Sequence, residues 1–100
     1  MRKITEQTVN AFYEGVNFKK DNMRVEVTKA NNIALYLHNN MIALLSGNEL
    51  TINDQGRKTN TTKERLNGLL NKYGLGKIQQ KAGKWLLNGE EFNGAKIFKL

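Results

Sequence analysis

Lysine and arginine side chains are concentrated in one segment of this chain. Eight of the sixteen basic residues lie between Arg57 and Lys84, where Glu64 is the single acid. The segment therefore carries a formal charge of +7, which equals the net charge of the whole chain. A localised positive field attracts polyanions or the acidic surface of another protein. Electrostatic binding is the chemistry that these residues favour.

The strongest candidate site is the start of a predicted helix, where cations and hydroxyl groups are mixed. Its residues are Arg57, Lys58, Thr59, Thr61, Thr62 and Lys63. Free N–H groups and the positive end of the helix dipole attract anions, so this group predicts a phosphate-binding site. The alternative is that Thr61 and Glu64 form a capping box, while the cations only keep the surface soluble.

A second candidate is a predicted hairpin that carries Lys77, Lys81 and Lys84. Lys77, Gln79 and Lys81 are spaced to share one strand face, and Lys84 follows the turn at Ala82-Gly83. Such a ribbon can follow a nucleic-acid backbone or enter a major groove. The alternative is an exposed edge on which lysines prevent pairing with another strand.

Aromatic residues offer weaker candidates. Trp85 stands beside lysines, as a base-stacking platform would, but the apolar run Trp85-Leu86-Leu87 favours a place in the core. Tyr36 and His38 are spaced to share the open face of a strand, opposite Leu35 and Leu37. They form an alternative interface, against the simpler interpretation of a half-exposed structural pair.

Catalytic and metal chemistry find little support. The chain has no cysteine and a single histidine, which excludes thiolate sites and any two-histidine zinc site. Glu90 and Glu91 are adjacent and point in opposite directions on a strand, so they do not converge as a catalytic pair does. Asp54 would need ligands from elsewhere to hold a metal. We expect a protein that is not an enzyme and that has no metal and no cofactor.

The first half predicts one helix followed by short strands. Val9, Phe12, Tyr13 and Val16 repeat at helical spacing in a helix that begins with Thr5 as N-cap and ends at Gly15. A loop over residues 17–22 follows, with Phe18 turned inward. Strands are expected at 23–27, 33–38, 41–45 and 50–52, with Asn39-Asn40 as the hairpin turn.

The second half predicts a helix and a small meander. The capping box at Thr61 to Glu64 begins the helix, Leu66, Leu69, Leu70 and Tyr73 form its apolar face, and Gly74 or Gly76 ends it. Strands are expected at 78–81, 84–87 and 95–98, separated by Ala82-Gly83 and by Asn-Gly steps.

These elements predict a single α+β domain over residues 1–100. The expected order is α-β-β-β-(β)-α-β-β-β, with both amphipathic helices packed on one face of an antiparallel sheet. The chain is 39% hydrophobic and 25% charged, as is usual for globular proteins, and has no apolar run long enough to span a membrane. We therefore expect no membrane contact and a cytoplasmic location.

Three segments carry a family resemblance: LYLHNNMIALL at 35–45, TNTTKERLNGLL at 59–70 and GKWLLNGEEFNG at 83–94. Together they resemble a family of short proteins encoded by bacteriophages and prophages. That family usually has glycine in place of Asn39, and an aromatic residue where this chain has Gly56-Arg57-Lys58. The resemblance implies a small phage accessory protein in the bacterial host cell and brings no activity with it.

Three functions remain open at this stage. The first is binding of DNA or RNA through the basic face, mainly by phosphate contacts. The second is inhibition of a host protein with an acidic or nucleic-acid-binding surface, such as a defence nuclease, a CRISPR effector or RNA polymerase. The third is capture of a small anionic nucleotide at the helix start. A homodimer is compatible with all three.

Overall fold

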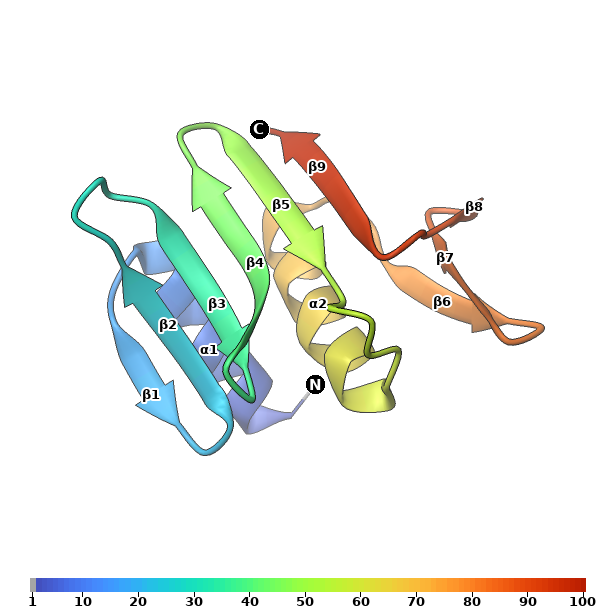
Figure 1. Cartoon of the computed structure of the whole chain (residues 1–100), viewed down its shortest axis with the longest axis horizontal. Helices are drawn as coiled ribbons and strands as arrows, with labels where there is room; N and C mark the ends of the chain where they lie inside the picture. The colour runs from blue at the N-terminus through green and yellow to red at the C-terminus, as the bar shows by residue number, and fades with distance from the viewer. Residues whose placement is uncertain (1) are drawn as a thin grey trace.

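The computed structural model describes residues 2–100 and has the predicted α+β class and element order (Figure 1). The elements of the first half are α1 (Lys3–Glu14), β1 (Phe18–Lys20), β2 (Met23–Val27), β3 (Ile33–Leu37), β4 (Asn40–Ser46) and β5 (Glu49–Asn53). Those of the second half are α2 (Asn60–Tyr73), β6 (Ile78–Lys81), β7 (Lys84–Leu87), β8 (Glu90–Glu91) and β9 (Ala95–Lys99).

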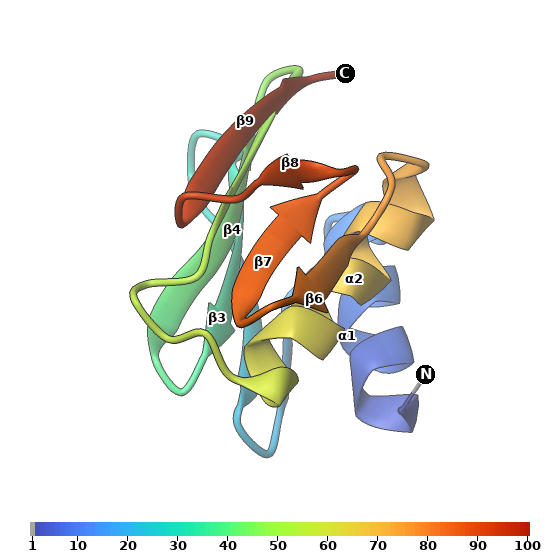
Figure 2. The ribbon, with the colours of Figure 1, turned by 90° about the vertical axis from the view of Figure 1, so that its right-hand side faces the viewer.

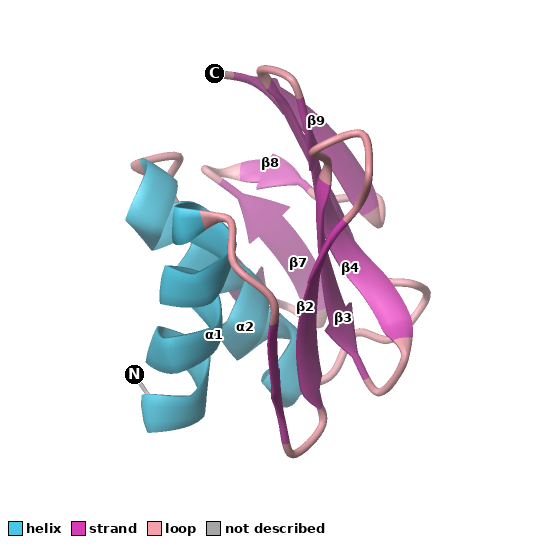
Figure 3. Ribbon diagram, turned by 90° about the vertical axis from the view of Figure 1, so that its left-hand side faces the viewer, coloured by secondary structure: helices cyan, strands magenta, loops and turns pink. Residues whose placement is uncertain are grey.

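The strands form two antiparallel sheets. The larger has the order β1-β2-β3-β4-β5-β9, and the smaller has the order β6-β7-β8. Both helices cover one face of the large sheet, as predicted, and the opposite face is left bare by the described residues 2–100 (Figure 3). The small sheet lies on the helix side, beside α2 (Figure 2).

The predicted closing meander is wrong in its last strand. β9 leaves the small sheet and pairs with β5, where Phe98 lies opposite the fully buried Leu50. This pairing gives Phe98 an apolar neighbour, whereas β8 is only two residues long and consists of two exposed glutamates. Burial of the Phe98 side chain is the physical reason that β9 pairs with β5 and not with β8.

Helix α1 begins earlier than the sequence predicts. Its N-cap is Arg2, so Thr5 lies inside the first turn and is fully buried. The helix ends at Gly15, whose φ of 72° is left-handed, as predicted. Val9 and Phe12 are buried, but Tyr13 and Val16 are about half exposed and do not join the core.

Helix α2 also departs from the expected cap. Thr59 is the N-cap, and its hydroxyl accepts a hydrogen bond from the Thr62 N–H at 3.1 Å. The capping box predicted for Thr61 and Glu64 is therefore wrong. The apolar face is confirmed, since Leu66, Leu69 and Leu70 are fully buried, and Gly74 ends the helix.

The predicted hairpin turns at Ala82-Gly83 and Asn88-Gly89 are confirmed. The one predicted at Asn93-Gly94 is wrong, because β9 pairs with β5, and the turn between β3 and β4 is shifted in register. The turn between β3 and β4 is His38-Asn39, with φ of 50° and 64°, rather than Asn39-Asn40. A β-bulge between Leu35 and Tyr36 accompanies this shift. The predicted loop before Met23 forms the short strand β1 instead, in which Phe18 pairs with Val25 and is partly buried.

Candidate anion-binding surface

Two of the eight basic residues between Arg57 and Lys84 are neutralised within the fold. Arg65 is 3% exposed, forms an ion pair with the Glu64 carboxylate, and donates to the Thr5 hydroxyl at 2.7 Å. Glu64 also accepts from the Arg2 backbone N–H at 3.1 Å and from the Thr5 hydroxyl at 2.5 Å. A carboxylate of α2 thus caps the start of α1, and this pair serves the packing of the two helices.

The environment of Glu64 lowers its pKa. Partial burial acts to raise the pKa of this carboxyl, but hydrogen bonds from Thr5, from the Arg2 N–H and from Arg65, with the charge of Arg65, outweigh that effect. The pKa of Glu64 therefore lies below its ordinary value. The ionised form is the one that the fold stabilises.

Lys58 is the second neutralised cation. Its ammonium group pairs with the buried Asp54 carboxylate at 2.5 Å and lies 5.0 Å from the Trp85 ring centroid and 5.3 Å from that of Phe92. Asp54 also accepts from the Gly56 N–H at 2.8 Å. Lys58 therefore joins the loop before α2 to the small sheet, although the sequence placed it among the free cations.

Five candidate cations keep their charge uncompensated. Among residues 2–100, no carboxylate lies within ion-pair distance of the group Arg57, Lys63, Lys77, Lys81 and Lys84, which we call the free basic group. Lys72 also has no carboxylate partner there, but it lies in the last turn of α2, with its ammonium 5.0 Å from the Tyr13 ring centroid.

The elements that carry the free basic group adjoin one another. Lys63 on α2 donates to the Gln80 side chain on β6 at 3.3 Å. Asn67 on α2 exchanges hydrogen bonds of 2.9 Å and 2.6 Å with the backbone of Ile78. Lys81 and Lys84 are direct partners across the β6–β7 turn. Like charges directly opposite on neighbouring strands repel, so this pair favours an anion between them.

The threonines at the helix start divide into structural and available groups. The Thr59 hydroxyl caps α2 and lies 3.0 Å from the hydroxyl of Thr62, which is buried. Thr61 is partly exposed. A small cavity of about 240 Å³ lies beside it, and its lining includes His38, Arg57, Thr59, Thr61 and Thr62. The structure thus brings His38 next to the helix start, a proximity that sequence reasoning missed.

The pair Tyr36 and His38 does not form one surface. Tyr36 lies on the open face of β3, where the Arg24 guanidinium is 4.1 Å from its ring centroid. His38 is an exposed turn residue, and its Nε2 lies 3.2 Å from the Asn22 amide nitrogen. The turn shift described above removes His38 from the strand face on which the sequence placed it.

The core assignment of Trp85 is confirmed. Its side chain is 3% exposed and stacks on Phe92, with ring centroids 6.4 Å apart. A ring covered in this way cannot hold a nucleic-acid base.

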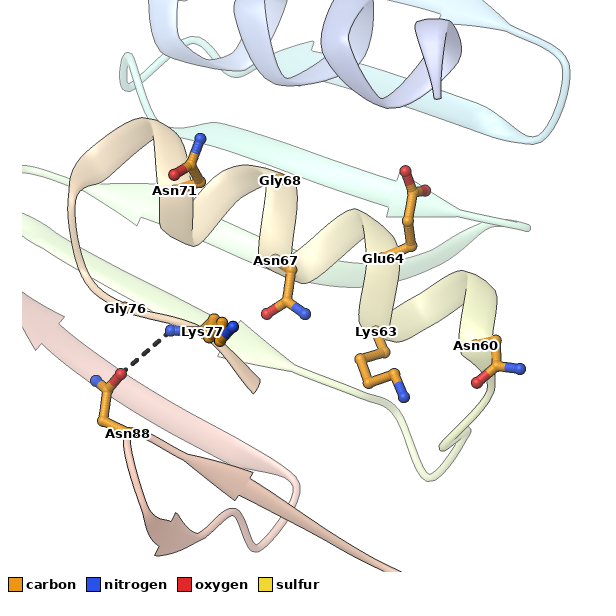
Figure 4. Close-up of a pocket in the computed structure, with 9 residues that line it drawn as sticks. All are labelled: Asn60, Lys63, Glu64, Asn67, Gly68, Asn71, Gly76, Lys77 and Asn88. Carbon is orange, nitrogen blue, oxygen red and sulfur yellow. Dashed lines mark hydrogen bonds between the residues drawn. The ribbon is translucent and has the colours of Figure 1, made fainter. Parts of the chain in front are cut away.

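A groove runs along the outer side of α2, and sequence reasoning did not identify it (Figure 4). Its volume is about 700 Å³, and its lining residues are Asn60, Lys63, Glu64, Asn67, Gly68, Asn71, Gly76, Lys77 and Asn88. The spacing of Asn60, Asn67 and Asn71 by seven and four residues places these amides on one helix face. That stripe of small polar residues was the available signal.

Residues 2–100 contain neither a metal-binding cluster nor a helix that could span a membrane. No group of three histidine, cysteine, aspartate or glutamate side chains is placed to hold a metal ion. Neither helix in that range has the length and apolar character required to cross a membrane.

Comparison with known protein families shows a relationship over almost the whole chain. A family model described as Kyanoviridae Gp96 protein matches residues 1–99. The match supports the phage origin implied by the three sequence segments. No curated protein and no solved structure matches the chain.

Proposed function

We propose that this chain, which belongs to the Kyanoviridae Gp96 family of phage proteins, binds nucleic acid in the cytoplasm of the bacterial host, mainly through phosphate contacts. The observation that carries the proposal is the free basic group on adjoining elements. Its members have no carboxylate partner within residues 2–100, and Lys81 and Lys84 face each other across a turn. Phosphates relieve this repulsion.

Binding of this kind depends steeply on salt and little on sequence. Each phosphate neutralised by a lysine or arginine releases counterions, so the logarithm of the affinity falls linearly with the logarithm of salt concentration. The slope measures the number of contacts, at about 0.7 per phosphate on single strands and about 0.9 on duplex DNA.

The test removes three charges from the proposed surface. The variant Lys63→Ala/Lys81→Ala/Lys84→Ala is compared with Lys19→Ala/Lys20→Ala/Lys29→Ala, which removes the same charge from the first half of the chain. Fluorescence anisotropy of labelled oligonucleotides across a salt series gives affinity and slope. We expect the first variant to lose about 2 to 3 units of slope and the second to stay near wild type. Equal losses in both variants would contradict the proposal.

A second candidate function rests on the bare face of the large sheet. Ala34, Leu44, Thr51 and Ile97 form a row across four strands, and Ile97 is 57% exposed. Ala34 in this row is buried, but Leu44 is partly exposed and Ile97 is exposed. Exposed apolar side chains on an open sheet face favour contact with a protein, such as a host defence nuclease, a CRISPR effector or RNA polymerase. Purification from the bacterial host separates the two candidates: a stoichiometric protein partner lost in Ile97→Asp favours inhibition, and bound nucleic acid favours the first function.

A further inference from the structure

We propose that the groove along α2 receives unpaired bases of a single nucleic-acid strand whose phosphates contact Lys63 and Lys77. This inference rests on the proposed function and makes it specific, because it selects single strands over duplexes. The groove residues other than these two lysines play no part in the phosphate contacts proposed above.

The shape of the groove suits unpaired nucleotides. Its volume of about 700 Å³ lies within the range of about 300 to 1,000 Å³ that is usual for small-molecule sites. Between Asn60 and Asn71, helix α2 extends about 16 Å at a rise of about 1.5 Å per residue. A concave site of this size accepts bases that are splayed out of a strand, which is how proteins usually read single strands. A duplex keeps its bases stacked inside.

The two walls of the groove are held together by asparagine side chains. Asn67 bonds both the N–H and the carbonyl of Ile78, as described above. Asn88 accepts from the Lys77 N–H at 3.1 Å and donates to the Leu75 carbonyl at 2.9 Å (Figure 4). Each of these two amides donates one hydrogen bond and accepts another within the fold, so they fix the width of the groove.

Two other amides in the groove are available. Asn60 and Asn71 are exposed, and their side chains form no hydrogen bond within residues 2–100. An asparagine amide both donates and accepts, which matches the paired donors and acceptors on the edge of a base. Both residues line the groove, at the two ends of the α2 wall, with the Asn71 side chain on the α1 side of the helix (Figure 4). They provide two places for base recognition.

Both walls of the groove contain a glycine. Gly68 lies in the α2 wall, where glycine costs about 1 kcal/mol of helix stability relative to alanine. Across the groove, a Cβ on Gly76 would lie 1.8 Å from the Asn88 Oδ1 atom, and the φ of Gly76 is +106°. A side chain at Gly76 would displace the amide that joins the two walls.

The charges in the groove favour a polyanion. Lys63 and Lys77 belong to the free basic group, and they come from opposite walls (Figure 4). Glu64 also lines the groove, but its carboxylate turns toward α1 and is engaged by Arg2, Thr5 and Arg65. The negative charge of Glu64 is therefore compensated, and the two lysines set the local field.

The test removes the free amides and leaves the charge unchanged. Asn60→Ala/Asn71→Ala is compared with Asn10→Ala/Asn48→Ala, a matched change away from the groove. The probes are a labelled 12-nucleotide single strand and a blunt duplex of the same sequence, in one buffer. For wild type we expect tighter binding of the single strand. In the groove variant we expect about tenfold weaker single-strand binding with the salt slope retained.

The possible outcomes separate this inference from the proposed function. Unchanged single-strand affinity in the groove variant, or equal wild-type affinity for strand and duplex, overturns the groove and leaves lysine-mediated binding intact. An absence of binding to both probes overturns both proposals. Movement of the Asn60 and Asn71 side-chain amide signals on titration with the single strand, with those of Asn67 and Asn88 stationary, supports the groove directly. Uniform unfolding temperatures among the variants confirm that the fold is retained.

Discussion

The interface between α1 and α2 and the β6–β7 hairpin use basic residues in opposite ways. At the helix interface, Arg65 is 3% exposed and pairs with Glu64. On the hairpin, Lys81 and Lys84 are exposed, lie opposite each other and have no carboxylate partner within residues 2–100. A buried charge must be compensated inside the protein, whereas an exposed one is stabilised by water. The comparison shows that local charge density alone does not identify a binding surface.

Lys58 stands between these two cases. It is adjacent to Arg57 in sequence and about half exposed, yet its ammonium pairs with the buried Asp54. The Lys58 ammonium therefore compensates a buried carboxylate while its side chain remains accessible to solvent. Substitution of Asp54 should therefore release the Lys58 ammonium from its structural pair and leave it free to contact a ligand.

The largest expected effect comes from breaking the buried pair. Glu64→Ala leaves the Arg65 cation buried without a carboxylate and removes the cap of α1. We expect a loss of about 3 kcal/mol in the free energy of unfolding, measured by urea denaturation. Glu90→Ala, which removes an exposed carboxylate from β8, should change it by less than about 0.5 kcal/mol. Similar losses of unfolding free energy in Glu64→Ala and Glu90→Ala would contradict the contrast between the buried pair and the exposed charges.

A smaller effect should appear in the pH dependence of stability. The pKa of Glu64 in the folded state lies below the ordinary value that the carboxyl has in the unfolded chain. Its contribution is therefore complete above that value and is lost as the pH falls through the folded pKa. Glu64→Gln should be less stable than wild type by about 2 kcal/mol at pH 7, and the difference should narrow as the pH falls below the ordinary carboxyl value and close below the folded pKa of Glu64. Denaturation at a series of pH values would show a constant gap if the ionised carboxylate is unimportant.

The smallest effect tests the intermediate case. Asp54→Asn keeps an oxygen for the Gly56 N–H but removes the negative partner of Lys58, and should cost about 1 kcal/mol of stability. The released ammonium should add up to about 0.9 to the salt slope on duplex DNA. Asp21→Asn, in the turn between β1 and β2, is the matched control and should leave the slope unchanged. A slope that does not rise in Asp54→Asn would mean that Lys58 cannot reach a phosphate.

Local patterns predicted the elements well and their ends poorly. The helical spacing of Leu66, Leu69 and Leu70 identified α2, because burial of one apolar stripe requires that period. The helix-cap predictions were wrong because a cap depends on residues that are neighbours in space. The Glu64 carboxylate could accept hydrogen bonds from N–H groups of its own helix or from the start of α1. The packing of the two helices brings it to the Arg2 N–H and the Thr5 hydroxyl.

The sequence predicted the candidate site as a cluster of basic residues, and only the fold showed which of these residues are paired with carboxylates. The segment 57–84 was identified from composition, but the division into paired and free cations required Asp54, which lies outside it. The spacing of Asn60, Asn67 and Asn71 marked one wall of the groove, but the opposite wall depends on the hydrogen bonds of Asn88 with Lys77 and Leu75, which no local pattern predicts.

By itself the sequence determined the α+β class, the order of the elements, the apolar faces and the location of the excess charge, because each of these depends on residues close together in the chain. Only the tertiary structure decided which cations are neutralised, where β9 pairs, that His38 adjoins the start of α2, and that a groove follows that helix. These depend on contacts between distant residues, whose free energies are set by burial and by the partner that packing brings within reach.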